Sequence, residues 1–340
     1  MVGCEVMFTM KKHVSKYLVL AVVIVLTLLL GLTWLLYKGE DDKYPGLGID
    51  SLHASNIDGR WISVAIIDQK LLINHKEYAA NLVYYKELQG LDTEPFSMHG
   101  PAVSSILVGK SCGVAPGADL YYWAVPVRGD RPSGVLYSQA IREVIELNES
   151  LPEERRIRVL SISTGFSKEE GADEFEAAIR EAWDSGIAVF TSSFPYFTDP
   201  VIAVFGAALK RGGARDKVDD YIVPPDVVLH RGQPAEEIVR LRHELGTGQM
   251  IYKPVWVPIE PRLLASPKGP KKYERFSTGG DSWATPYVAG VAALILQVNP
   301  ALSNKQVVEI IADSTTYNRG GLAMISPQQA IAKALGDNTN

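Results

Sequence analysis

One serine in the sequence stands where a hydroxyl group could be made reactive. Ser282 follows the small residues Gly279 and Gly280 and precedes a long apolar run, which predicts a position at the N-terminal end of a buried helix. A serine there lies beside unpaired backbone N–H groups and the positive end of the helix dipole, which favour a developing negative charge. A serine that only caps the helix would give the same pattern, so this stretch alone leaves both interpretations open.

An aspartate and a histidine further upstream favour the catalytic interpretation. The apolar run from Val64 ends at Asp68, which predicts a buried strand with this carboxylate at its C-terminal end. His99 comes directly before a pattern that predicts a helix over 103–108. Imidazole titrates near neutral pH, so His99 could accept the proton of Ser282 while Asp68 holds the imidazole tautomer. Each residue alone would more often be structural, but the order Asp, His, Ser indicates a serine nucleophile.

The residues around these three positions resemble the subtilisin-like serine proteases (subtilases). Three stretches carry the resemblance: Val64–Asp68, His99–Gly109 with Gly113–Leu120, and Gly280–Gly290. It covers most of the chain beyond the N-terminal segment. It implies a serine endopeptidase in which Ser282 forms an acyl-enzyme, His99 transfers protons and Asp68 orients the imidazole. The departures from the family's pattern in and beside these stretches are Gln69, Asp281, Trp283 and Tyr287.

The resemblance also implies where a substrate would bind. The stretch Val159–Gly165 is similar to a strand that lines the cleft in the family and pairs with the substrate backbone by β-addition. Ser163, Thr164 and Gly165 would then contact the substrate, together with Thr191.

The family's oxyanion donor is missing from this sequence. Subtilases usually place an asparagine after the strand that corresponds to 186–193, whereas this chain continues with Ser192, Ser193 and Phe194. A hydroxyl of Ser193 or Ser192 could act as the donor, and the alternative is that these serines only end the strand. Removing such a donor costs about 10²–10³ in rate, so this departure concerns turnover more than fold.

Alternating strand and helix patterns must bring these residues together. They predict an α/β fold with a doubly wound, mostly parallel, subtilisin-like sheet whose site lies at the C-terminal ends of the strands. We expect this peptidase domain at 56–337, with a surface insertion at about 209–258. Ser303 and Gln306 form a capping box that predicts one more helix near the C-terminus.

The N-terminal segment predicts a transmembrane helix. The stretch Tyr17–Tyr37 has no charged side chain and is long enough to cross a bilayer. Three lysines precede it, and mixed charges follow it, which favours a cytoplasmic N-terminus. The alternative is a cleaved signal peptide, although Gly31-Leu32-Thr33 is a poor cleavage site.

We therefore expect a single-pass protein of the cell membrane with an extracytoplasmic catalytic domain. Residues 1–16 would form a short cytoplasmic tail, 17–37 the signal-anchor and 38–55 a tether. Many subtilases carry a propeptide between the leader and the catalytic domain. Because this tether is too short to hold one, the catalytic domain is expected to fold without it.

Composition and motifs limit the other chemistry that the chain could perform. A net charge of −5 gives no electrostatic case for nucleic acid as a partner. The sequence lacks His-Glu-x-x-His and Cys-x-x-Cys motifs, so we expect no metal in the site and no required cofactor. The resemblance also allows structural calcium, for which no residues are assigned. We expect His75, His230 and His243 at the surface. Cys4 and Cys112 flank the span and cannot pair, so Cys112 is expected to be a buried apolar residue.

Two other functions compete with proteolysis, and one other protease type competes with the subtilase resemblance. The first is an inactive subtilase homologue that binds peptides or a membrane partner, which the missing asparagine and the departures at Gln69 and Asp281 would explain. A lipase-like hydrolase would have Gly-x-Ser-x-Gly and its histidine last, and neither is present. A trypsin-like enzyme would have its histidine before its aspartate, the reverse of the order found here.

Overall fold

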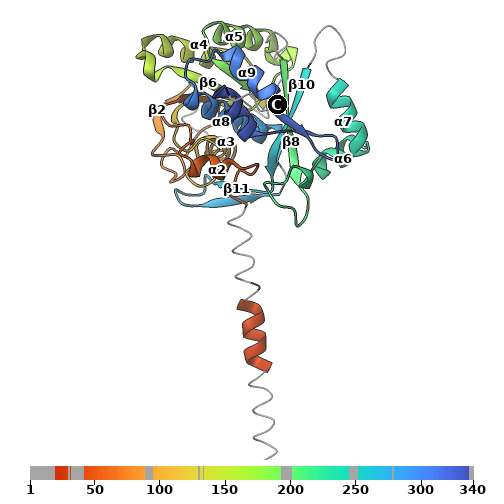
Figure 1. The fold of residues 1–340 in the computed structure, drawn as a ribbon. Coiled ribbons are helices and arrows are strands. Elements are labelled where there is room, and N and C mark those ends of the chain that lie inside the picture. Colours follow the sequence, from red (N-terminus) through yellow and green to blue (C-terminus); the bar gives the residue numbers. More distant parts are fainter. Residues whose placement is uncertain are drawn as a thin grey trace, which may run out of the picture. The chain divides into compact units, whose positions relative to one another are not determined.

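The computed structural model describes residues 20–29, 31, 42–88, 95–128, 131–132, 134–192, 201–244, 252–277 and 279–336. It divides into two units, 1–42 and 43–340 (Figure 1). In the first unit, residues 20–29 are helical and exposed. None of the helices in the described ranges combines the length and the apolar composition needed to cross a membrane. Of the expected span, 17–19, 30 and 32–37 lie outside the described residues, as does the expected tail 1–16.

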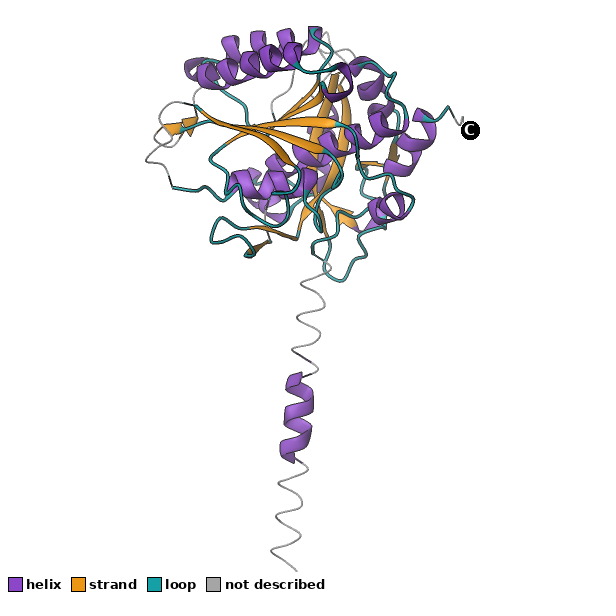
Figure 2. Cartoon of the chain, turned by 90° about the vertical axis from the view of Figure 1, so that its left-hand side faces the viewer, coloured by secondary structure: helices purple, strands orange, loops and turns teal. Residues whose placement is uncertain are grey.

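The second unit is built on a parallel sheet of five strands with the order β2-β3-β1-β6-β7. These strands are β1 (Ser63–Asp68), β2 (Leu82–Glu87), β3 (Asp119–Ala124), β6 (Ile157–Ile162) and β7 (Ala188–Thr191). Helices lie on both faces of the sheet (Figure 2). They are α3 (His99–Val108) and α8 (Asp281–Val298) on one face, and α4 (Gly134–Ser150) and α5 (Ala172–Asp184) on the other. The expected α/β fold with a mostly parallel sheet is confirmed.

The central strand β1 shows why Asp68 faces the α3–α8 side. Val64 and Ile66 belong to the apolar cluster that includes α3 and α8, whereas Ala65 and Ile67 belong to the cluster that includes α4 and α5. Successive side chains of a strand point to opposite faces, so Asp68 continues the face of Val64 and Ile66. The whole strand is buried, so Asp68 at its C-terminal end is buried as well.

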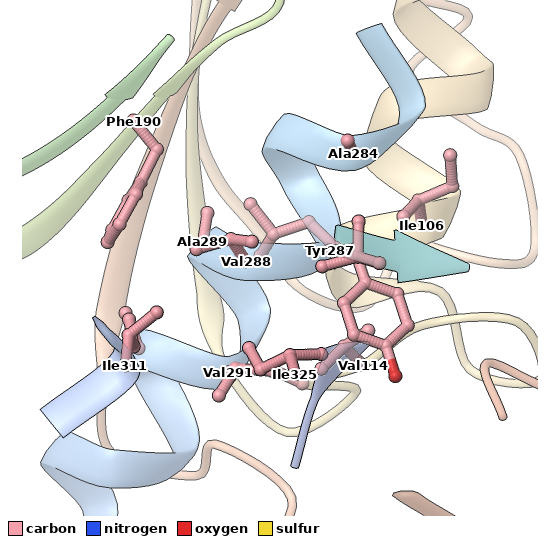
Figure 3. Close-up of a cluster of buried hydrophobic side chains, with 14 of the residues drawn as sticks. Ile106, Val114, Phe190, Ala284, Tyr287, Val288, Ala289, Val291, Ile311 and Ile325 are labelled. Carbon is pink, nitrogen blue, oxygen red and sulfur yellow. The ribbon is translucent and has the colours of Figure 1, made fainter. Parts of the chain in front are cut away.

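Helix α8 is deeply buried, because every residue from Trp283 to Leu296 is buried. Figure 3 shows its side chains, including Tyr287 and Val288, packed with Ile106 of α3 and with Val114. The close approach depends on Gly290, where an added Cβ would lie 2.5 Å from Cβ of Val114. The small residues of the sequence thus allow the helix to lie inside the core, as expected.

A second sheet has the order β13-β14-β10-β8-β9. Its strands are β8 (Val201–Leu209), β9 (Tyr221–Ile222), β10 (Tyr252–Glu260), β13 (Thr315–Tyr317) and β14 (Ala323–Ile325). Strands β8, β10 and β14 are parallel, and β9 and β13 pair antiparallel at the edges.

The stretch 209–258, expected to be a surface insertion, contributes to this second sheet. It holds the helices α6 (Pro225–Arg231) and α7 (Ala235–Glu244), but it ends in β10, where Val255, Trp256 and Val257 are fully buried. Prolines are unfavourable within a sheet, so the two prolines of the sequence Lys-Pro-Val-Trp-Val-Pro argued against a strand at this position. The ladder accommodates them with a register shift between Pro258 and Glu260.

The segment expected to be a tether is packed where the structure describes it. Helix α2 (Ile49–Ala54) buries Ile49 and Leu52, and the backbone carbonyl of Gly46 accepts a hydrogen bond from the Tyr287 hydroxyl at 3.1 Å. At the other end of the chain, α9 (Asn304–Ala312) begins with the predicted capping box of Ser303 and Gln306. Helix α10 (Pro327–Ala334) packs against α8 and α9.

Candidate active site

Asp68 and His99 form a close pair at the C-terminal edge of the first sheet. Nδ1 of His99 lies 2.7 Å from Oδ1 of Asp68, and the carboxylate is only 2% exposed. Strand β1 ends at Asp68 and α3 begins at His99, so the ends of two elements fix the pair. The helix starts four residues earlier than the apolar pattern predicted, because Gly100 and Pro101 occupy its first turn.

Gln69 and Ser97 hold this pair from both sides. The backbone N–H of Gln69 donates to Oδ1 of Asp68 at 2.7 Å, and the Ser97 hydroxyl donates to the side-chain oxygen of Gln69. The same Ser97 hydroxyl oxygen accepts the backbone N–H of His99 at 2.9 Å. Gln69, a departure from the family's pattern, therefore links the aspartate strand to the start of the histidine helix.

The surroundings of His99 change its acidity. Burial of the ring acts to lower its pKa, but the charge of Asp68 and the hydrogen bond to it outweigh burial, so the pKa of His99 lies above its usual value. The imidazolium form is thus stabilised relative to an isolated histidine. A general base that must hold a proton during reaction benefits from this stabilisation.

Ser282 lies at the start of α8, as the sequence predicts, but its hydroxyl is not directed at His99. Its Oγ donates to the backbone carbonyl of Ser163 at 3.2 Å. Within the described residues, the Ser282 hydroxyl has this carbonyl as its hydrogen-bond partner, and the hydroxyl makes no hydrogen bond to His99. The backbone N–H of Ser282 belongs to the first turn of α8, where helix N–H groups have no intrahelical acceptor.

Trp283 connects the serine helix to the histidine. Its ring centroid lies 5.4 Å from that of His99 and 5.5 Å from that of Phe276, and the residue is 4% exposed. The large indole therefore covers one side of the imidazole and keeps water from that side. From the sequence, Trp283 was identified only as a departure from the family's pattern. Its contact with His99 could not be predicted.

The other predicted site residues lie near Ser282 or fall outside the description. Strand β6 ends at Ile162, so Ser163, Thr164 and Gly165 follow the strand instead of belonging to it. Thr191 ends β7 and pairs with Ile162 in the ladder. Two serines were candidates for the oxyanion donor. Oγ of Ser192 lies 3.1 Å from Oγ1 of Thr285 in α8, and Ser193 is outside the described residues.

Asp281, which precedes the serine, is directed away from the reacting group. Its Oδ1 accepts the backbone N–H of Gly206 in β8 at 2.9 Å. A carboxylate in the first turn of a helix is also stabilised by the helix dipole. The residue thus ties the start of α8 to the second sheet.

His75 is fully buried, so its prediction as a surface residue was wrong. Its Nε2 bonds to the Lys272 carbonyl at 2.8 Å, and its ring packs edge-on against Tyr273. The neighbouring Glu77 accepts hydrogen bonds from Ser111 and Tyr273, and Cys112 lies beside it as a buried free thiol, as predicted. The four residues 74–77 are all polar, and only the tertiary fold buries His75. The side chains at 230 and 243 are outside the description.

No group of three or more His, Cys, Asp or Glu side chains that could hold a metal ion occurs within the described ranges. What the described edge does contain is an acid–imidazole pair next to a serine at a helix start. These are the components of hydroxyl activation.

The sequence matches one known family, described as the Subtilase family, over residues 59–196 and 265–331. The matched residues are more than half of the chain, and they include Asp68, His99 and Ser282. The chain belongs to the subtilase family.

Individual proteins are also similar to this chain. Serine protease AprX of Bacillus subtilis (strain 168) is 26% identical to this subtilase over an alignment of 302 residues, which covers 77% of this chain and 63% of AprX. The chain thus spans less than two thirds of the length of this relative. The prenylagaramide maturation protease PagA has the same fold, with a TM-score of 0.58 and 20% identity over 86% of this chain and 99% of PagA. The self-cleaved protease domain of PatA also has this fold, with a TM-score of 0.55 and 23% identity. The match covers 83% of this subtilase and 100% of that domain.

Sequence reasoning missed several residues that shape the site of this subtilase. Ser97 is one, because it lies one residue before the N-cap Met98, outside the position at which a capping serine is expected. Glu260 is another, since it ends an apolar strand as Asp68 does, and its buried carboxylate accepts the N–H of Gly279 at 2.7 Å. Both roles depend on partners that are remote from the residue along the chain.

Proposed function

We propose that this chain is a serine endopeptidase that hydrolyses peptide bonds through Asp68, His99 and Ser282. The observation that carries the proposal is the Asp68–His99 pair, 2.7 Å apart, at the same edge of the core as a serine in the first turn of a buried helix. Family membership supports the same three positions, because all lie in the matched residues.

In the proposed reaction, the Ser282 hydroxyl first leaves the Ser163 carbonyl. A rotation about χ1 directs Oγ toward Nε2 of His99, and such adjustments are common between free and substrate-bound sites. His99 then takes the hydroxyl proton while Oγ attacks the scissile carbonyl carbon. The leaving amine receives that proton, and water hydrolyses the acyl-enzyme by the same route in reverse. The chain's own side chains and water suffice for these steps, so we propose that no cofactor takes part.

The negative oxygen of the tetrahedral intermediate needs hydrogen-bond donors. We propose that the backbone N–H of Ser282 is one, because it lies in the first turn of α8 and is not used within the helix. The second would come from the hydroxyl of Ser192 or Ser193, the predicted replacements for the missing asparagine. The contact of Ser192 with Thr285 keeps its hydroxyl beside the first turn of α8.

The substrate would be an extended peptide or protein segment. We propose that it pairs with Ser163, Thr164 and Gly165 just beyond β6, and that the Thr191 side contributes to the adjoining pocket. Entry of the peptide would compete with Ser282 for the Ser163 carbonyl. Substrate binding would thereby release the nucleophile.

The test is an active-serine probe applied to the full chain in detergent, together with hydrolysis of a peptide library. A fluorophosphonate should label the protein, and Ser282→Ala should abolish both labelling and hydrolysis. Ser303→Ala, a serine remote from the site at the α9 N-cap, is the matched control and should keep both. Peptide binding without labelling would instead identify an inactive homologue, the competing function.

We also propose that residues 17–37 anchor the chain in the cell membrane with the catalytic domain outside the cytoplasm. The support is the uncharged run in the sequence and the lysines before it. The full chain should remain with the membrane after alkaline carbonate extraction, and protease added to intact cells should digest its catalytic domain. Introducing Leu28→Arg and Leu29→Arg should release the chain, and retention of that variant would contradict the anchor.

A further inference from the structure

A second buried carboxylate lies close to the candidate nucleophile and has no part in the steps above. Glu260 is the last residue of β10 and is 3% exposed. Its Oε2 accepts the backbone N–H of Gly279 at 2.7 Å. Burial of a carboxylate is unfavourable unless hydrogen bonds compensate the lost hydration, so this contact stabilises its charged form.

The partner of Glu260 belongs to the turn that leads into the serine helix. Gly279 lies three residues before Ser282, and the carbonyl of Gly280 accepts the N–H of Trp283 at 2.9 Å. The turn also packs directly on the indole, because a Cβ added to Gly279 would lie 2.0 Å from Cδ1 of Trp283. The same indole contacts the ring of His99. A shift of Gly279 would therefore move both Ser282 and the face of the imidazole.

The turn and the acid–imidazole pair are attached to different sheets. Asp68 is part of the first sheet, whereas Glu260 belongs to β10 of the second. Asp281 makes the second attachment of the serine turn, through the N–H of Gly206 in β8. Two carboxylates thus fix the start of α8 to the second sheet, one on each side of Gly280.

We propose that Glu260 is a positioning residue, whose ionised carboxylate holds the Gly279–Asp281 turn so that Ser282 can reach His99. The inference depends on the proposed serine chemistry, and it adds a residue outside the Asp68, His99 and Ser282 set. A charged acceptor holds an amide N–H more firmly than a neutral one, so the turn is most ordered when Glu260 is ionised.

The acidity of Glu260 makes this role measurable. Burial raises its pKa to about 7, the Gly279 hydrogen bond opposes that rise, and the charge of Asp226 on α6 adds to it. The carboxyl therefore gains and loses its proton within the range in which a serine peptidase is assayed. Below about pH 7 the acceptor of the Gly279 N–H is the neutral carboxyl group of Glu260, and above about pH 7 it is the carboxylate.

The experiment compares kcat and KM of the full-length protein and its Glu260→Gln variant from pH 5.5 to 9, with a peptide that the wild type cleaves. Glutamine keeps the shape and an acceptor oxygen but carries no charge. We expect kcat of the variant to be about fivefold to tenfold lower above pH 8 and nearly equal below pH 6, with KM unchanged. Glu309→Gln, the same change on the outer face of α9, is the matched control, and its kcat should equal the wild-type value at every pH.

A ratio of wild-type to variant kcat that does not vary with pH would overturn the inference, because a merely structural defect lowers activity equally at all pH values. If the variant fails to fold, the wild-type profile decides. It must then show a fivefold to tenfold fall in kcat centred near pH 7, where Glu260 takes up its proton, and a profile without that step would overturn the inference. Absence of any hydrolysis that Ser282→Ala abolishes would overturn both this inference and the proposed function, and is recognised before Glu260 is varied.

Discussion

At the scale of single residues, one oxygen atom of Asp68 accepts two hydrogen bonds that hold the site together. Oδ1 of Asp68 accepts both the N–H of Gln69 and the ring nitrogen of His99, each at 2.7 Å. The first contact fixes the carboxylate and the second fixes the imidazole. The charge of Asp68 also offsets the effect of burial on His99 and leaves the histidine pKa above its usual value.

The variant Asp68→Asn should therefore change both rate and pH dependence. We expect kcat/KM to fall by about 10⁴, because the amide can stabilise the wrong imidazole tautomer and gives no charge to the imidazolium. With that charge removed, burial dominates and the pKa of His99 falls. The acid limb of the pH profile, which follows deprotonation of His99 in the free enzyme, should move to lower pH.

Two measurements check this prediction. Steady-state kinetics from pH 5 to 9 gives the rate and the limb, and NMR of the His99 ring gives its titration directly. Asp313→Asn, at a salt bridge with Lys253 on the surface, is the matched control and should change neither. A limb that stays in place in Asp68→Asn would contradict the account of the histidine pKa.

Not all of these residue contacts could be predicted. The positions of Asp68, His99 and Ser282 at the ends of elements could be predicted, because each element has a clear apolar pattern. The hydroxyl of Ser282 was expected to face His99, yet it donates to the Ser163 carbonyl, a choice between rotamers that sequence patterns do not determine. The burial of His75 and the contact of Trp283 with His99 depend on segments that are distant along the chain.

At the scale of elements, the serine helix α8 is the centre of the domain. It packs against α3, α10 and strands of both sheets. The sequence predicted this position correctly from its small residues, because Ala289, Gly290, Ala292 and Ala293 permit close approach. Strand β10 was not predicted, since prolines interrupt its apolar run and the strand formed only through pairing with β8.

Gly290→Ala should destabilise the domain, although alanine is the better helix former. On an exposed helix the change would add about 1 kcal/mol of stability. Here the new methyl group would meet Val114 at 2.5 Å, and overpacking of this kind costs about 1–3 kcal/mol. Urea denaturation of the full chain gives the free energy of unfolding for both proteins.

A second substitution tests the cause of that loss. Val114→Gly removes the Cβ that the new methyl group would meet, so the double variant Val114→Gly with Gly290→Ala should be more stable than the sum of the two single changes predicts. Strict additivity, or a gain in stability from Gly290→Ala alone, would show that α8 and the segment at Val114 are not in the contact described.

At the scale of the whole molecule, buried ionisable groups set how stability varies with pH. The pKa of Glu260 is raised from 4.5 to about 7, so the folded state holds its proton more tightly than the unfolded chain does. Its contribution to stability is complete below 4.5 and is lost as the pH rises through 7. His99 has the same sign, because its pKa is also raised. Glu77 has the opposite sign: burial would raise its pKa, but hydrogen bonds from Tyr273 and Ser111 lower it.

The wild-type protein should therefore be less stable at pH 8.5 than at pH 5.5, and Glu260→Gln should reduce that difference by about 2 kcal/mol. The variant has no carboxyl group to ionise at this position, so the charge is no longer buried as the pH rises. Urea denaturation at the two pH values measures the effect. Equal pH dependence in both proteins would show that Glu260 does not titrate near neutrality, and Glu309→Gln serves as the exposed control.

The fold class of the molecule could be predicted because alternating strand and helix patterns leave few arrangements. The division of the described strands into two sheets could not be predicted, since it depends on which edges pair. Residues 64–68 and 99–109 identified the first sheet and its helix. In the second sheet, β9 and most of β10 come from the stretch 209–258, which carried no motif.

The hydrogen bond between Gly46 and Tyr287 has a practical consequence for anyone who shortens this protein. A chain starting after Gly46 would leave a phenol oxygen sealed in the interior with its acceptor gone, on the helix that carries Ser282. A chain that is cut at Pro45 or earlier keeps that partner. A chain that begins at α2 loses it, and the buried Tyr287 hydroxyl is left without this acceptor. The position at which the chain can be shortened without this loss is thus set by a tyrosine more than two hundred positions away.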